Sequence, residues 1–161
     1  MPEVVAKLHA AGQPVDVIHL AGSRDREQVV EAYAKTNAHA EVHGFHQDMA
    51  GVYRRADFAI SRSGANSCLE LALFGIPALL IPYPFSARNH QVANANAMVA
   101  AHAADMLEQK DITADKLAAH LGKRLADSAS LSAMRQAAHT RVIPGADEKL
   151  ADLVEEVTRP R

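Results

Sequence analysis

Several residue types are scarce in this sequence, and each shortage excludes a class of protein. Tryptophan is absent and aromatic residues make up only 4% of the chain, too few for the stacking platforms of single-strand nucleic-acid binders. The 17 lysines and arginines are balanced by 19 aspartates and glutamates, so the net charge is −2 and we expect no nucleic-acid partner. The single cysteine, Cys68, excludes an internal disulfide and is typical of a reducing compartment.

Long apolar runs are also lacking. No run approaches the roughly 20 residues that a membrane-spanning helix needs, and no positively charged segment precedes an apolar one as in a secretory signal. With 161 residues, of which 48% are hydrophobic, the sequence fits one domain with a full core. We find no internal repeat, low-complexity stretch or linker. We therefore expect a single domain over residues 1–161 and a cytoplasmic location.

Segments typical of strands alternate with segments typical of helices. Val15–Leu20 is a β-branched run that ends near Gly22, while Asp48 and Thr113 are good N-cap residues for the helices after them. Such alternation predicts an α/β fold with a doubly wound, parallel, Rossmann-like sheet. The predicted strands are 15–20, 40–45, 57–61, 77–81 and 104–107, and the predicted helices are 2–11, 24–35, 49–55, 66–74, 90–102, 114–125, 131–140 and 146–157.

The predicted order opens with a helix, which is unusual for this architecture. A nucleotide-binding half of this kind begins with a central strand and a glycine-rich turn. Neither precedes the predicted helix over residues 2–11. We therefore expect the fold to lack its first strand or to borrow one, and a homodimer or a partner chain to cover the exposed position.

The segment from Ser61 to Glu70 predicts the end of a strand, a tight turn and a helix. Gly64 permits a positive φ or a close approach to the backbone, and the helix start after it offers free N–H groups to an anion. Glu70 lies four residues after Asn66 on the same helix face, where a carboxylate can accept hydrogen bonds from both ribose hydroxyls. The alternatives are an ordinary strand–helix turn and a Glu70 that is solvated or paired with Arg62.

A second polar loop, Arg88 to Asn94, opens the helix after the next predicted strand. Gln91 and Asn94 are three residues apart and point to the same side, and neutral amides suit sugar hydroxyls, which both donate and accept. Capping by Asn89 and simple solubility are the alternatives. Both loops follow parallel strands at one sheet edge, so their groups together suit a sugar nucleotide, with helix N–H groups for its phosphates.

The segment around His46 lies at the carboxyl end of another predicted strand, where ligands of open α/β sheets bind. Its backbone groups can pair with the edge of a flat base. His43, His46 and His90 lack cysteine or carboxylate companions at ligand spacing, so we expect no metal. Cys68 is expected to be a small core residue, and the sequence has neither a nucleophile elbow nor a phosphate-binding P-loop motif.

At these residues the chain resembles the C-terminal domain of the MurG family, the UDP-GlcNAc transferases that convert lipid I to lipid II in peptidoglycan synthesis. The likeness extends from Val4 to Val157, and an ordered set of motifs carries it. These motifs are Gly44-Phe45, Asp48-Met49, Ala56-Asp57, Arg62 to Ala65 with Glu70, Gly75 to Pro77, His90 to Ala95 and Ile143 to Asp147.

The resemblance implies the C-terminal, donor-binding half of a GT-B glycosyltransferase that uses no metal or other cofactor. It implies that the backbone at His46 meets the uracil, that Glu70 takes the ribose hydroxyls, and that Gln91 reads the GlcNAc hydroxyls. Arg62 would support the turn, and residues 65–68 would approach the diphosphate and ribose. The implied substrate-binding residues are His46, Arg62, Gly64, Ala65, Asn66, Ser67, Cys68, Glu70, His90, Gln91 and Asn94.

Nothing in this sequence resembles the acceptor half of the family or the glycine-rich phosphate loop of its donor half. The general base belongs to the acceptor half, so the catalytic residue is unknown and we expect the chain to be inactive alone. Lipid I would be bound through a missing or separate N-terminal half, at the cytoplasmic face of the inner membrane. Three hypotheses follow: the C-terminal portion of a hexosyltransferase, truncated or split into two chains; a non-catalytic UDP-sugar-binding module; and, least supported, a nucleotide-sugar epimerase of GT-B shape.

Overall fold

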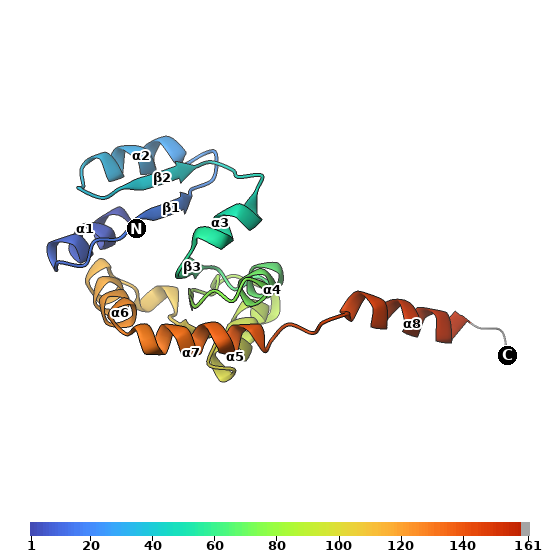
Figure 1. Ribbon diagram of the computed structural model, residues 1–161. Helices are drawn as coiled ribbons and strands as arrows, with labels where there is room; N and C mark the ends of the chain where they lie inside the picture. The colour runs from blue at the N-terminus through green and yellow to red at the C-terminus, as the bar shows by residue number, and fades with distance from the viewer. Residues whose placement is uncertain (159–161) are drawn as a thin grey trace.

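The computed structural model describes residues 1–158, in which helices and strands alternate from α1 to β5 (Figure 1). The strands are β1 Val17–Leu20, β2 Ala40–His43, β3 Ala59–Ser61, β4 Ala78–Leu80 and β5 Ala104–Met106. The α-helices are α1 Pro2–Ala10, α2 Arg26–Ala34, α3 Met49–Arg55, α4 Ala65–Leu73, α5 His90–Ala100, α6 Ala114–Ala126, α7 Ser128–His139 and α8 Ala146–Thr158. Two short 3-10 helices, η1 Ala87–Asn89 and η2 Gln109–Asp111, precede α5 and α6.

The strands form two parallel ladders with an interruption between β1 and β3. β1 pairs with β2, from Val17 opposite Ala40 to Leu20 opposite His43, and β4 lies between β3 and β5. A Rossmann sheet has the strand order 3-2-1-4-5-6, and β1 to β5 match strands 2 to 6 of that order. Strand 1 would lie between β1 and β3, where the described residues supply no strand. The predicted parallel α/β architecture is thus confirmed, and residues 1–158 contain no strand at the first position of that order.

Helices cover both faces of the β3–β4–β5 ladder. Ala78 and Leu80 of β4 pack into one core with residues of α4, α5 and α7. Leu79 packs into a second core with Leu8 of α1 and Leu121 of α6. This alternation follows from the two-residue period of a strand. All three β4 residues are fully buried, whereas β3 is only half-buried, as expected for a strand with a partner on one side.

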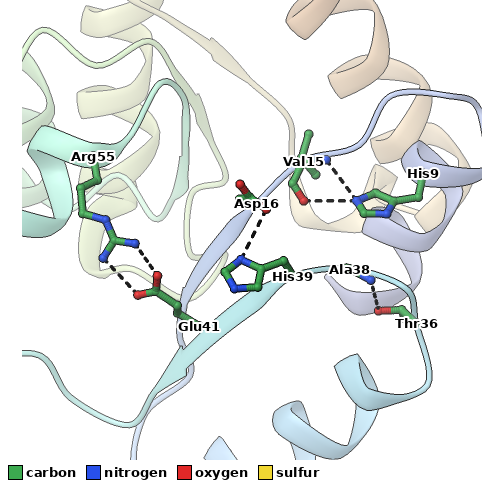
Figure 2. A network of polar contacts seen from close by, with 8 residues as sticks. All are labelled: His9, Val15, Asp16, Thr36, Ala38, His39, Glu41 and Arg55. Carbon is green, nitrogen blue, oxygen red and sulfur yellow. Dashed lines mark hydrogen bonds and ion pairs between the residues drawn. The ribbon is translucent and has the colours of Figure 1, made fainter.

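Polar contacts fix the β1–β2 ladder to the helices beside it (Figure 2). The His9 imidazole at the end of α1 accepts a hydrogen bond from the Val15 N–H at 3.1 Å. Arg55, the last residue of α3, forms an ion pair with Glu41 of β2. Because α3 connects the two ladders, this ion pair restrains the helix that passes from one ladder to the other.

Side chains cap the starts of α3, α6 and α7, and the sequence predicted the first two of these caps. Asp48 accepts a hydrogen bond from the Gly51 N–H at 2.8 Å, and Thr113 accepts one from the Lys116 N–H at 3.2 Å, so both predicted caps are confirmed. The predicted start of α7 at residue 131 is wrong. The helix begins at Ser128, because Asp127 caps it by accepting a hydrogen bond from the N–H of residue 130 at 2.9 Å.

The last helix, α8, extends away from the other elements (Figure 1). None of its residues is buried, and its apolar side chains Leu150, Leu153, Val154 and Val157 are 55–77% exposed. The folded body therefore consists of α1 to α7 and the two ladders. Over residues 1–158, the structure has no helix with the length and apolar character needed to cross a bilayer.

Candidate functional site

The turn between β3 and α4 lies at the centre of the predicted site. Gly64 is the N-cap residue, and no side chain caps the helix. The Cys68 N–H donates to the Gly64 carbonyl at 3.0 Å, which is the first hydrogen bond of the helix. The N–H groups of Ala65, Asn66 and Ser67 precede that bond, so they are the groups that a helix start offers to an anion.

Gly64 does not use the positive φ that glycine permits, so of the two alternatives for this residue only a close approach to its backbone remains. Its φ is −62° and its ψ is 152°. A Cβ at this position would meet only the Ser67 Oγ, at 3.8 Å. The described residues thus leave the space over the turn open, which allows a ligand to approach the backbone.

Cys68 is a core residue, as predicted. Its side chain is buried in the core beneath α4, and burial raises the pKa of its thiol. Its N–H is used inside the helix. Of the four predicted helix-start residues, only the first three therefore present free main-chain donors.

Ser63 and Asn94 join the turn to α5. The Ser63 side chain is completely buried, and its Oγ donates to the Gln91 carbonyl oxygen at 2.8 Å. The Asn94 side-chain amide donates to the Ser63 carbonyl oxygen at 3.0 Å. The two polar loops that the sequence places at one sheet edge are therefore in direct contact. The Asn94 Oδ1 has no donor among residues 1–158.

Gln91 and Arg62 both contact the loop that follows β4. The Gln91 Oε1 accepts a hydrogen bond from the Tyr83 N–H at 2.9 Å, which leaves its amide nitrogen as a donor. Arg62 donates to the first two main-chain carbonyls after β4, each at 3.2 Å, and to the Gln109 Oε1 at 2.8 Å. Its guanidinium also lies 5.6 Å from the centre of the Tyr83 ring. Arg62 supports this loop, and the alternative of an Arg62–Glu70 pair is not observed.

Glu70 lies on the exposed side of α4, where a residue of α3 holds its carboxylate. The Tyr53 hydroxyl donates to the Glu70 Oε2 at 2.8 Å, and no other residue of the described chain donates to this carboxylate. Burial of the ring and the Glu70 carboxylate raise the pKa of Tyr53 above its ordinary value. The hydroxyl therefore stays protonated at neutral pH and remains a donor.

His46 and His90 make local contacts. The His46 ring packs edge-on against that of His43, with ring centres 4.9 Å apart, and its Nδ1 is buried without a hydrogen-bond partner in the described chain. The His90 Nδ1 lies 2.7 Å from the Ala87 carbonyl oxygen, at the junction of η1 and α5. The hydrogen bonds that join the two polar loops do not involve either histidine.

The chemistry of the joined loops is that of main-chain N–H groups, amides and one carboxylate, which bind anions and hydroxyls. Ala65, Asn66 and Glu70 are exposed, so these groups face solvent. A cavity of about 410 Å³ lies elsewhere, between α2 and β2. Within residues 1–158, no three histidine, cysteine, aspartate or glutamate side chains lie close enough to hold a metal ion.

Two residues that build this arrangement were not among the predicted site residues. Ser63 had a signal, because a small polar residue directly before Gly64 stands between a strand and a helix. Tyr53 had none. Only the packing of α3 against α4 brings its hydroxyl to Glu70.

The chain matches the family model described as the glycosyltransferase family 28 C-terminal domain over residues 1–157. It is 40% identical over 152 residues to the UDP-N-acetylglucosamine--N-acetylmuramyl-(pentapeptide) pyrophosphoryl-undecaprenol N-acetylglucosamine transferase of Aeromonas hydrophila, covering 94% of this chain and 41% of that protein. The Nostoc punctiforme protein of the same name is 42% identical over 143 residues, which cover 88% of this chain and 38% of that one. The chain thus spans about 40% of the length of these curated relatives.

Solved structures show the same likeness. The crystal structure of Acinetobacter baumannii MurG aligns with a TM-score of 0.87 at 29% identity, covering 96% of this chain and 44% of that one. The glycosyltransferase VinC in complex with dTDP aligns with a TM-score of 0.71 at 21% identity, covering 94% and 35%, and shares the fold.

Proposed function

Because this chain belongs to the glycosyltransferase family 28 C-terminal domains, we propose that it binds UDP-GlcNAc as the donor half of a glycosyltransferase. The observation that carries this proposal is the contact between the two polar loops, which gathers free N–H groups, a carboxylate and two amides. Ligands of open parallel sheets bind at the carboxyl ends of strands. A nucleoside diphosphate sugar presents the matching groups, namely phosphates, ribose hydroxyls and sugar hydroxyls.

Each group of the site has a role in this proposal. The N–H groups at the start of α4, from Ala65 to Ser67, compensate the charge of the diphosphate. The Glu70 carboxylate accepts hydrogen bonds from the ribose hydroxyls. The Gln91 amide nitrogen donates to a GlcNAc hydroxyl, with the Asn94 Oδ1 nearby as an acceptor. The backbone at His46 pairs with the uracil.

The complete enzyme transfers GlcNAc to lipid I and forms lipid II, in keeping with the activity that the relatives' names give to those proteins. A hydroxyl of the acceptor MurNAc attacks the anomeric carbon while the bond from that carbon to UDP breaks, so the configuration inverts. The proton of the attacking hydroxyl passes to a general base in an N-terminal half. The N–H groups of α4 stabilise the charge on the departing UDP. A lipid-linked acceptor requires a membrane surface, which in this proposal is the cytoplasmic face.

A donor-binding module without catalysis is the second candidate. The composition of the site favours it, because all of the groups assigned above serve the donor. Such a module acts either as a sugar-nucleotide binder or as the donor subunit of a two-chain glycosyltransferase. Turnover on mixing the chain with a separately produced acceptor half would favour the two-chain enzyme over the binder.

Calorimetric titration with UDP, UDP-GlcNAc and UDP-glucose tests the donor site. We expect UDP-GlcNAc to bind more tightly than UDP-glucose, and Glu70→Ala to weaken UDP binding about tenfold to a hundredfold, because charge-assisted hydrogen bonds are lost. Glu31→Ala, which removes an exposed glutamate of α2, is the matched control and should bind like the wild type. A folded wild-type chain that does not bind UDP would contradict the donor site. Undiminished UDP binding by Glu70→Ala would contradict the ribose role of Glu70.

A further inference from the structure

We propose that Tyr53 is a positioning residue that holds the Glu70 carboxylate in place for the ribose hydroxyls. This inference rests on the proposed function, because it assigns a supporting partner to the ribose-binding group. It starts from the 2.8 Å hydrogen bond that the Tyr53 hydroxyl donates to the Glu70 Oε2.

The Tyr53 ring is fixed by packing between α3 and α4. It lies against the Phe74 ring, with ring centres 5.3 Å apart and planes inclined by 33°. Both rings pack on the core beneath α4. The Arg54 guanidinium lies 5.8 Å from the centre of the same Phe74 ring. Because Phe74 follows Glu70 by one helical turn, the aromatic pair and the hydrogen bond lie on the same side of α4.

The helix that carries Tyr53 is held at both ends. Asp48 caps the start of α3 through the Gly51 N–H at 2.8 Å, and Arg55 pairs at its end with Glu41 of β2. Figure 2 shows the second of these contacts, in which the guanidinium reaches from α3 to the edge of β2. These contacts support the helix, and the packing of the Tyr53 ring on Phe74 then places the hydroxyl beside Glu70 without a ligand.

A fixed hydrogen-bond donor matters for Glu70 because this side chain is exposed and otherwise free to change rotamer. A free glutamate loses rotamer freedom when it binds a ligand, and this loss reduces affinity. A donor fixed beside Oε2 restricts the side chain before the ligand arrives. The Glu70 Oε1 has no donor among residues 1–158, and Oε2 retains a second acceptor position. The carboxylate therefore keeps an acceptor for each of the two ribose hydroxyls.

Titration of Tyr53→Phe with UDP and 2′-deoxy-UDP tests the inference. We expect UDP affinity to fall about threefold to tenfold, as for one lost hydrogen bond, and 2′-deoxy-UDP affinity to fall less. In the Glu70→Ala background, Tyr53→Phe should cause no further loss of UDP affinity, because its effect passes through Glu70. Tyr33→Phe is the matched control. It removes a hydroxyl that lies 3.3 Å from the His19 Nδ1 beside the other ladder and should leave both affinities unchanged.

The outcomes separate this inference from the proposed function. Equal losses for UDP and 2′-deoxy-UDP, or the same loss with and without Glu70, would show that Tyr53 only stabilises the fold. Unchanged UDP binding by Tyr53→Phe would also overturn the positioning role, while the loss on Glu70→Ala would still support the donor site. A wild-type chain that does not bind UDP would overturn the proposed function and the inference with it.

Discussion

Only the oxygen of the Gln91 side-chain amide makes a hydrogen bond within residues 1–158. This oxygen accepts the Tyr83 N–H at 2.9 Å, whereas the amide nitrogen has no acceptor in the described chain. We expect Gln91→Ala to weaken UDP-GlcNAc binding about threefold to tenfold, the effect of one hydrogen bond, and to change UDP binding much less. Calorimetry with both ligands measures the difference, and Gln136→Ala, an exposed glutamine on α7, is the control. Equal losses for the two ligands would show that Gln91 holds the loop and does not read the sugar.

Residue types at this site were predictable from the sequence, but their partners were not. A carboxylate one turn into a helix and two amides three residues apart are visible as spacing. Arg62 illustrates the limit, because its charge left a pair with Glu70 open as an alternative, whereas the guanidinium donates to the loop after β4. When several acceptors lie within reach of a flexible side chain, the tertiary structure determines which of them it contacts. Sequence spacing contains no information about that choice.

At the scale of elements, the junction of α4 and β4 depends on a glycine. Gly75 has a φ of +62°, and a Cβ there would lie 2.2 Å from the Nε2 of His139 on α7. We expect Gly75→Ala to destabilise the chain by about 1–2 kcal/mol, because the smaller cost of turning the exposed His139 ring aside adds to the backbone strain. Gly12→Ala is the control, since Gly12 has a φ of +75° with nothing within 4 Å of the added Cβ, and it should cost about 1 kcal/mol.

Urea denaturation of the two variants measures the difference in the free energy of unfolding. Adding His139→Ala to Gly75→Ala should remove the destabilisation that comes from the clash with the ring. The destabilisation that comes from backbone strain should remain. Equal destabilisation by Gly75→Ala and Gly12→Ala would contradict the close contact between α7 and the turn before β4.

The order of the elements was predictable where a segment carries a local signal. The β-branched run Val15–Leu20 marks the first strand, and Asp48 and Thr113 mark helix starts with side chains that accept a main-chain hydrogen bond. Where the signal was ambiguous, the boundary was wrong. Asp127 caps α7 at Ser128, but several polar residues there offered equally good starts. The N-cap is the residue whose polar side chain the folded chain directs toward the free N–H groups.

At the scale of the whole molecule, the interruption of the sheet was foreseen from the opening helix. A strand order that runs from 2 to 6 leaves a position between β1 and β3, and that argument needs only the order of strands along the chain. How the two ladders are joined was not predictable. The α1–α6 core joins them, with a smaller contribution from the exposed ion pair between Arg55 and Glu41, and both depend on contacts between residues far apart in the sequence.

The last helix provides a test of where the folded body ends. Because no residue of α8 is buried, a chain that ends at Gly145 loses little packing energy. We expect its melting temperature to change by less than about 2 °C and its UDP affinity to match that of the full chain. A chain that ends at Asp127 is the control, because it also loses Met134 and Ala138 of α7 from the core and should be strongly destabilised. If the shorter deletion alone lowers the melting temperature substantially, α8 packs against the body in solution, and its exposed leucines and valines belong to the core.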